Sequence, residues 1–363
     1  MDSADLAFII PTRDRPGELA RTLDRLGALA PTMLGRNPRV VVIDNASTPR
    51  AEAPTRLPNN VRVELIRSEA NLGAAARNVG ARACDADWLV MLDDDSSPEP
   101  CALAPTLREA PDDLAAVGGE IVLPTGAREA GGLPEVIIGC GCAIRREPFL
   151  RLGGYDPAFD YYAEEYDLCA RLIADGWRVA HTRRLRFEHR KATLGRDFGR
   201  ILARLVRNNA WVIHRYTPAS EVDDAMRSML ARYERIASRE RVDAAYAEAA
   251  CEAVRTLAEQ HRCPLSMSAW DRFIGAAAVR DAFTALDLAG RDVRLVGRGK
   301  GADVIEQSVI AAGGRLCESP NAVDLIATLS PGSMLDAASR YPGALLPWSD
   351  ALWSAEPAPA LAG

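Results

Sequence analysis

Short apolar runs alternate with amphipathic stretches along the first third of the chain. Residues 6–10, 40–43, 61–66 and 88–92 are apolar runs bounded by polar or turn-forming residues, which predicts four buried strands. Residues 16–29 and 73–83 carry apolar positions at helical spacing between these runs. Strands separated by helices predict an α/β fold, with a mostly parallel sheet flanked by helices.

Polar side chains follow three of these predicted strands where each strand ends. Thr12 follows the first strand, Asp44 the second, and Asp93, Asp94 and Asp95 the fourth. Ligands of such sheets bind at the C-terminal ends of the strands. Three adjacent carboxylates repel one another unless a cation lies among them, and oxygen ligands suit Mg²⁺ or Mn²⁺. We therefore expect a divalent ion here, which would in turn neutralise a diphosphate.

The pattern changes after residue 216. Two helices are predicted over roughly 220–236 and 242–260, and a separate α/β unit follows. That unit contains one helix running through Trp270, Ile274 and Val279, and a helix over 302–312. Its predicted strands are 293–296, 315–317, 325–329 and a short one at 344–346. The expected domains are a catalytic domain (1–215), a helical linker (216–262) and a Rossmann-like accessory domain (263–363).

Composition narrows the function classes. The 363-residue chain is 48% hydrophobic, with a net charge of −6, and a nucleic-acid binder would usually be basic. The sequence has no apolar run of about 18 residues and no secretory pattern at its start, and its eight cysteines then favour reduced thiols and a cytoplasmic location. The spacing of Cys140 and Cys142 favours strand packing over a zinc or redox site. The basic amphipathic segment 194–215 fits either packing on the protein or peripheral membrane contact, and a homo-oligomer is compatible with the sequence.

Six ordered blocks resemble the family 2 glycosyltransferases. They are IIPTRDR (9–15), VVIDNAST (41–48), NLGAAARNVG (71–80), LDDD (92–95), GGYDPAF (153–159) and EEYDLCARL (164–172). The resemblance covers about residues 5–215. It implies the GT-A nucleotide-diphospho-sugar transferase fold and an inverting, metal-dependent hexosyl or deoxyhexosyl transfer. The donor would be a UDP- or dTDP-sugar. The acceptor would be a hydroxyl of a glycan, a lipid-linked molecule or a small glycosylated molecule, as in polysaccharide biosynthesis.

The same resemblance assigns the donor-binding residues. Those expected around the nucleotide base are Pro11, Thr12, Arg13 and Asp44. Asn71, Gly73 and Arg77 come from the block in which small residues let the backbone approach the donor, and Arg77 offers charge to the diphosphate. Asp93 matches the position that reaches the ribose and Asp95 the one that binds Mn²⁺ or Mg²⁺. Asp94 is an alternative ligand.

An inverting transfer also needs a base for the acceptor hydroxyl. The family places it in a Glu-Asp pair, and this chain has Glu164 and Glu165 there, so Glu165 is the expected base and Glu164 its competitor. A downstream histidine often completes the metal shell in the family. His189 matches that position, and His181 is its rival.

The C-terminal unit contains a G-x-G-x-x-A pattern at residues 297–302, between a predicted strand and a helix. This context is typical of a dinucleotide site, but a structural module for assembly or acceptor recognition fits as well. Two other functions remain open. One is a nucleotidyltransferase, although residues 11–17 lack its glycine-rich signature, and the other is a non-catalytic nucleotide-sugar-binding scaffold.

Overall fold

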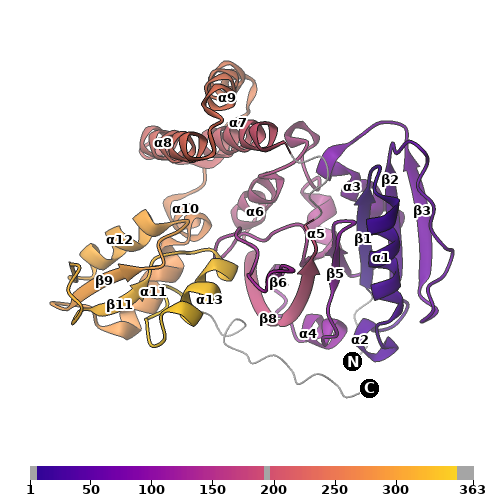
Figure 1. The fold of residues 1–363 in the computed structure, drawn as a ribbon, viewed down its shortest axis with the longest axis horizontal. Coiled ribbons are helices and arrows are strands. Elements are labelled where there is room, and N and C mark those ends of the chain that lie inside the picture. The colour runs from indigo at the N-terminus through magenta and orange to yellow at the C-terminus, as the bar shows by residue number, and fades with distance from the viewer. Residues whose placement is uncertain (1–5, 192–196, 350–363) are drawn as a thin grey trace.

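The computed structural model describes residues 6–191 and 197–349 (Figure 1). An eight-stranded sheet forms the centre of the larger part, with the strand order β3-β2-β1-β4-β7-β6-β8-β5. One half is parallel, as the sequence predicts. It contains β1 (Leu6–Thr12), β2 (Arg39–Asn45), β3 (Arg62–Ser68) and β4 (Trp88–Met91).

The other half of the sheet is mixed. It contains β5 (Ser96–Pro98), β6 (Leu114–Val122), β7 (Cys142–Arg145) and β8 (Arg178–His189). β7 pairs antiparallel with both β4 and β6, while β8 runs parallel to β6. The short strand β5 pairs antiparallel with the end of β8, and Ser96 stands opposite His189. This pairing brings the histidine beside the aspartates that precede β5.

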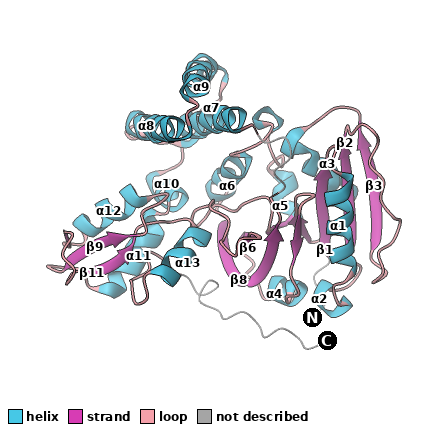
Figure 2. Cartoon of the chain, viewed as in Figure 1, coloured by secondary structure: helices cyan, strands magenta, loops and turns pink. Residues whose placement is uncertain are grey.

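Both faces of the sheet are covered (Figure 2). Alternate residues of β1 face opposite ways: Phe8 lies in the core with α1, and Ile9 lies in the core with α3 and α6. The Cβ of a residue replacing Gly80 would lie 2.8 Å from Ile9, so this glycine allows α3 to approach β1 closely. The helical elements of this part are α1 (Pro16–Gly27), α2 (Pro31–Leu34), η1 (Gly73–Ala75), α3 (Ala76–Ala83), α4 (Leu103–Arg108), α5 (Arg146–Arg151), η2 (Pro157–Phe159) and α6 (Glu164–Ala174).

Three helices share a second hydrophobic core above the sheet domain (Figure 1). They are α7 (Phe198–Tyr216), α8 (Val222–Glu240) and α9 (Asp243–Thr256), followed by η3 (Leu257–Glu259). Leu202 and Val206 of α7 are buried in this core, whereas Phe198 is exposed. Because α7 packs on α8 and α9, the apolar face of the basic segment is covered by protein over much of its length. None of the described helices is long and apolar enough to cross a membrane.

The C-terminal unit is a three-stranded parallel sheet with helices around it. Its elements are α10 (Met267–Ile274), α11 (Ala276–Leu286), β9 (Asp292–Val296), α12 (Ala302–Ala311), β10 (Arg315–Leu316), β11 (Val323–Ile326) and α13 (Pro331–Arg340). The prediction of one helix through Trp270 and Val279 was wrong, because Gly275 adopts a left-handed conformation (φ 86°) and separates two helices. The prediction of a short strand at 344–346 was also wrong, because an isolated bridge between Leu345 and Leu325 takes its place.

Candidate active site at the strand ends

The polar residues predicted at the strand ends do lie together. Thr12 and Asp44 are opposite each other in the pairing of β1 with β2. The Thr12 hydroxyl donates to Asp94 Oδ2 at 2.9 Å, which connects the end of β1 to the aspartates after β4. The carboxyl ends of three adjacent strands therefore form one continuous polar edge.

Asp44 is a buried, ionised turn cap. Its carboxylate accepts hydrogen bonds from the backbone N–H groups of Ser47 (2.8 Å) and Ala51 (3.1 Å), and it pairs with Arg67 at the end of β3. Burial alone would raise the pKa of Asp44, but these hydrogen bonds outweigh it and the pKa is lowered. Arg67 was not predicted as a site residue. Arg13, predicted beside Asp44, has a half-exposed side chain and pairs with Asp14.

The three aspartates point in different directions. Asp94 and Asp95 are buried and share Arg15, whose Nη1 lies 2.6 Å from Asp94 and whose Nη2 lies 2.6 Å from Asp95. Burial raises the pKa of Asp94 to about 7, against the opposing effect of Arg15. Asp93 is the accessible member, with its side chain 34% exposed. The sequence did not single out Arg15, although it lies within the first family block.

Arg77 is a buried arginine of α3 that contacts the accessible aspartate. It forms an ion pair with Asp93 and donates to the backbone carbonyl oxygens of Leu92 (3.1 Å) and Gly139 (3.4 Å). Burial opposes its charge, yet the field of Asp93 and other groups raises the pKa of Arg77. The guanidinium thus holds the segment that precedes the acidic turn against the loop that precedes β7.

The glycine-rich block before α3 approaches another loop closely. Gly73 has φ 58°, and a Cβ at this position would lie 2.3 Å from the backbone oxygen of Asp160. Asn71 Oδ1 accepts from Gly73 N at 3.1 Å. Asn45, which was not predicted as a site residue, donates to the carbonyl of Gly73 and accepts from Leu72 N. Only glycine suits this backbone conformation and approach at position 73.

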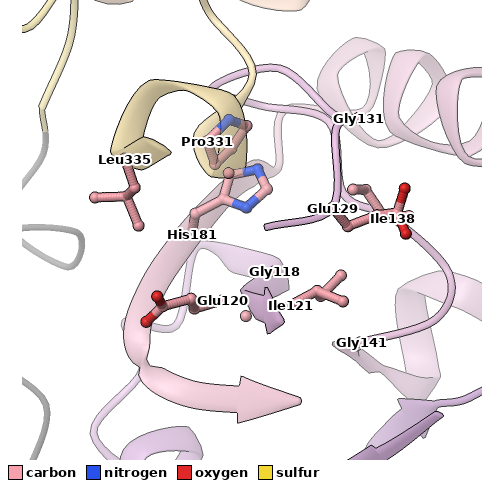
Figure 3. A pocket seen from close by; sticks show the side chains of 12 residues that line it. Gly118, Glu120, Ile121, Glu129, Gly131, Ile138, Gly141, His181, Pro331 and Leu335 are labelled. Carbon is pink, nitrogen blue, oxygen red and sulfur yellow. The ribbon is translucent and has the colours of Figure 1, made fainter. Parts of the chain in front are cut away.

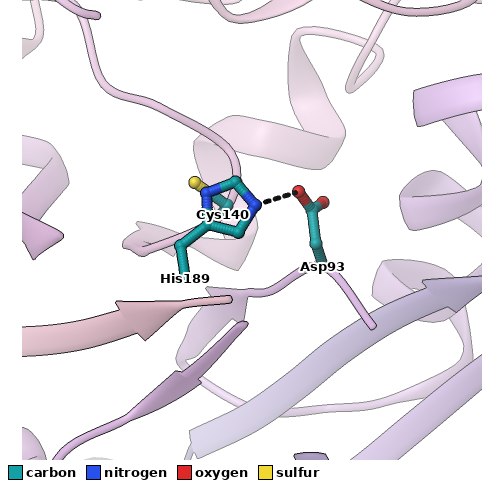
Figure 4. A group of neighbouring side chains, drawn as sticks. All are labelled: Asp93, Cys140 and His189. Carbon is teal, nitrogen blue, oxygen red and sulfur yellow. Dashed lines mark ion pairs between the residues drawn. The ribbon is translucent and has the colours of Figure 1, made fainter. Parts of the chain in front are cut away.

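His189 lies among the carboxylates, whereas His181 does not. The Nε2 atom of His189 is 3.4 Å from Asp95 Oδ1. It is 4.0 Å from Asp93 Oδ2, and Figure 4 shows this pair. On the other side of the ring, Nδ1 lies 2.9 Å from Glu129 Oε2. The Nε2 atom of His181 instead faces the carbonyl oxygens of Leu133 and Val136.

This group of side chains fits a divalent ion. Asp93, Cys140 and His189 each offer a ligand atom, and the three atoms lie within 4.8 Å of one another. A carboxylate on the second nitrogen of the ring, as Glu129 is here, is the usual way to orient a ligating histidine. Burial raises the pKa of the Cys140 thiol to about 11, so the carboxylate oxygens and the imidazole are the better donors. The carboxylate oxygens suit Mn²⁺ or Mg²⁺.

The sequence did not predict two of these side chains at the site. Cys142 does lie in β7 as expected, but Cys140 precedes the strand and faces the metal site. Glu129 had no sequence signal, because it lies in an irregular segment far from every family block. Burial opposes a proton on His189, but hydrogen bonds with Asp95, Cys140 and Glu129 raise its pKa to about 12. Such an environment favours positive charge, whether a proton or a metal ion.

The paired glutamates begin α6. Glu165 Oε1 accepts a hydrogen bond from the backbone N–H of Gly139 at 2.9 Å. Glu164 is buried, and its Oε2 has no hydrogen-bond partner in the part of the chain that the structure describes. Burial raises the pKa of both carboxyls, and both interact with Arg77 and Asp93 through their charges. The glutamates and the acidic turn therefore belong to one site.

Part of the chain is similar to known glycosyltransferases. Residues 7–153 match the model described as glycosyl transferase family 2. An uncharacterized glycosyltransferase of Haemophilus influenzae is 30% identical over 47% of the chain and 62% of the relative. The pre-mycofactocin glycosyltransferase of Mycobacterium tuberculosis is 28% identical over 49% of the chain and 41% of the relative. The chain therefore matches less than two thirds of the length of these relatives.

The fold is that of the GT-A glycosyltransferases. The structure of GalNAc-T7 with UDP, GalNAc and Mn²⁺ superposes with a TM-score of 0.50 at 16% identity, covering 74% of the chain and 57% of that protein. The predicted fold class is confirmed. Glu164, Glu165 and His189 lie beyond the segment that the family model matches, so their roles stay predictions.

Proposed function

We propose that the chain is a metal-dependent inverting glycosyltransferase. It transfers a sugar from a nucleotide diphosphate to a hydroxyl of a glycan, lipid-linked or small glycosylated acceptor. The observation that carries this proposal is that Asp93, Asp95 and His189 come together at the C-terminal edge of the sheet. Arg77 connects this group to Glu165. The match to the family 2 model and the GT-A fold support the same function.

In this proposal the donor nucleotide lies along the ends of β1 and β2. Asp44 would accept a hydrogen bond from the base N–H of UDP or dTDP, and Pro11, Thr12 and Arg13 would line the same pocket. Asn71 and Gly73 would let the backbone approach the donor. A divalent ion held by Asp95 and His189, with Asp93 or Asp94 nearby, would supply positive charge to the departing diphosphate.

Glu165 is the proposed base. Its carboxylate would take the proton of the acceptor hydroxyl while the oxygen attacks the anomeric carbon and the nucleoside diphosphate leaves from the opposite face. The hydrogen bond from Gly139 fixes one carboxylate oxygen, leaving the other for the acceptor. Glu164 is the second candidate, but its unpaired buried oxygen and strongly raised pKa favour a neutral carboxylic acid.

The first experiment is hydrolysis of a panel of nucleotide sugars with Mn²⁺, with Mg²⁺ and with a chelator. Metal-dependent release of UDP or dTDP from one donor is the expected result. Release of pyrophosphate from a nucleoside triphosphate and sugar phosphate would instead indicate a nucleotidyltransferase. Donor binding without turnover in the presence of acceptor glycans would favour a scaffold. The cytoplasmic location and the domain boundaries at 215 and 262 stay predictions.

A further inference from the structure

The glycines of the C-terminal loop, residues 297–302, lie close to other residues of the same unit. A Cβ at Gly297 would lie 2.8 Å from Ala337, one at Gly299 2.8 Å from Thr328, and one at Gly301 2.5 Å from Leu329. The glycines thus allow close packing inside the unit itself, and this packing explains them without a bound pyrophosphate.

One side chain of this loop reaches into the catalytic part of the molecule. Lys300 Nζ donates a hydrogen bond to the hydroxyl of Tyr166, and it lies 4.2 Å from the centre of the Tyr166 ring. Tyr166 is in the first turn of α6, directly after Glu165. The ring of Phe273, from α10 of the C-terminal unit, packs edge-on against Tyr166 at 6.2 Å. The residue next to the proposed base is therefore held from the C-terminal side.

Lys300 is a buried lysine that lies near another positive charge. No carboxylate forms an ion pair with it among the described residues, and its side-chain nitrogen contacts Tyr166. Burial and the positive charge of Arg232, from α8, lower the pKa of Lys300, while Glu165 raises it, and the resulting pKa is about 7. Charged groups that act on Glu165 from other elements are Arg77 and Asp93.

Lysine is rare in this chain, and its rarity draws attention to Lys300. Of the 44 lysine and arginine residues, two are lysines, Lys191 and Lys300. Both lie at the candidate site, since Lys191 Nζ is 2.9 Å from Oε1 of Glu129, the residue that contacts His189. Arginine cannot lose its proton in a protein and carries a planar fork, whereas lysine is compact and can be deprotonated. A compact ammonium group is therefore present at these two positions, where most other positive charges of the chain are guanidinium groups.

A second connection joins the C-terminal unit to the same site. Residues 128–139 carry both Glu129 and Gly139, and the C-terminal unit holds this segment at its start. The Ser330 hydroxyl accepts from Gly131 N (3.0 Å) and donates to its carbonyl (2.6 Å), while Asp336 of α13 pairs with Arg128.

The contact between the two parts leaves little space. Figure 3 shows α13 residues Pro331 and Leu335 facing His181 and Glu129 across a cavity of about 20 Å³, lined also by glycines of β6. This volume holds a water molecule at most, so neither a sugar nor a nucleotide fits in this cavity. The C-terminal unit is thus packed directly on the segment that supports the site.

We propose that Lys300 is a positioning residue of the candidate active site, which holds the first turn of α6 through Tyr166 and so fixes Glu165. The C-terminal unit is then a working part of the transferase and not a separate dinucleotide-binding module. The effect on Glu165 rests on the proposed function, whereas the mechanical coupling of Lys300 to α6 does not.

The test compares Lys300→Met with Arg298→Met in the full chain. Arg298 is in the same loop but is exposed and pairs with Glu306, so it is the matched control. For donor hydrolysis we expect Lys300→Met to lower kcat about 10- to 100-fold, the scale of a small misplacement of a reacting group, with the donor Kd unchanged. Arg298→Met should match the unmodified protein. An unchanged kcat in a folded Lys300→Met, or a raised donor Kd alone, would overturn the proposal.

Hydrogen exchange provides a readout that does not depend on activity. The amides of residues 164–168 should exchange faster in Lys300→Met and in Tyr166→Phe, and remain unchanged in Arg298→Met. If the unmodified protein hydrolyses no donor but this difference is seen, the proposed function fails while the coupling stands. Equal exchange in all variants would overturn the coupling. Tight binding of NAD to the full chain would overturn the packing role of the glycines.

Discussion

The Nε2 atom of His189 lies 3.4 Å from Oδ1 of Asp95, although β6, β7 and α6 separate the two residues in the chain. The pairing of β5 with the end of β8 creates this proximity, because β5 starts directly after Asp95 and places Ser96 opposite His189. Two strand ends from distant parts of the sequence thus form the candidate metal site. At this distance the two side chains could bind one ion between them.

Asp95→Ala is the sharpest test of this site. Removing the carboxylate should lower metal-dependent donor hydrolysis more than about 100-fold, because an ion at the departing diphosphate contributes about 3–4 kcal/mol or more to transition-state stabilisation. The measurement is kcat/KM as a function of Mn²⁺ concentration. Asp94→Asn is the comparison, since Asp94 bonds to Thr12 and Arg15 rather than to His189. A larger loss of kcat/KM in Asp94→Asn than in Asp95→Ala would identify Asp94 as the metal ligand.

The sequence predicts the parallel half of the large sheet well because its signals are local. The four strands of the parallel half follow from short apolar runs, and α1 follows from Leu19, Leu23 and Leu26 at helical spacing. The C-terminal unit was predicted less accurately. The break at Gly275 depends on one left-handed residue packed against Leu329 and Pro134, which is a tertiary contact and leaves no local pattern.

The candidate site was predictable where a residue follows an apolar strand or matches the family resemblance. Asp44, Asp93 and Asp95 could be named because each follows an apolar strand. Glu129 and Cys140 could not, because they reach His189 from an irregular segment whose path is set by the C-terminal unit. Ser330 fixes that segment from a part of the chain remote in sequence. Side chains supported by tertiary contacts of this kind have no sequence spacing to reveal them.

Glu129→Gln tests the orientation of the histidine. Glutamine keeps the size of the side chain but loses the charge that faces His189 Nδ1 and Lys191. We expect Mn²⁺ affinity to fall about 10- to 100-fold, as for other residues that orient a ligating histidine. The metal titration of donor hydrolysis measures this, and Glu109→Gln, an exposed partner of Arg184, is the control. An unchanged Mn²⁺ requirement would remove Glu129 from the metal site.

Glu165→Gln and Glu164→Gln distinguish the two candidate bases. In Glu165→Gln the side chain keeps an oxygen for the Gly139 N–H but cannot accept a proton, so transfer should fall about 10²- to 10⁴-fold with donor affinity retained. Glu164→Gln should be much milder, because its carboxyl is already favoured in the neutral form. Single-turnover transfer and donor binding are the measurements. If Glu164→Gln is inactive and Glu165→Gln is active, the base is Glu164 and not Glu165.

The pH dependence of activity should follow from the same carboxyl. Burial raises the pKa of Glu165 above that of an ordinary glutamate. The ionised form is the base, so kcat should fall as the pH decreases through this raised pKa. The acidic limb of the kcat profile is therefore expected above pH 4.5, the usual pKa of glutamate. In Glu165→Gln the residual rate should lack this limb. A limb that persists in the variant would assign it to another group.

His181 should make one identifiable contribution to the pH dependence of stability. Burial lowers the pKa of this histidine from 6.5 to about 4, against the opposing hydrogen bonds to the carbonyls of Leu133 and Val136. Below pH 6.5 the unfolded chain takes up a proton at this position and the folded chain does not, so the contribution of His181 to stability falls as the pH decreases towards 4. The contribution of this one group is at most about 3 kcal/mol.

Urea unfolding of the full chain and of His181→Gln measures the contribution of His181. The two measurements are made at about pH 7 and about pH 5, on either side of the ordinary histidine pKa. The variant should be less stable at the higher pH but lose less free energy of unfolding between the two pH values. Equal losses would show that His181 can be protonated in the folded protein.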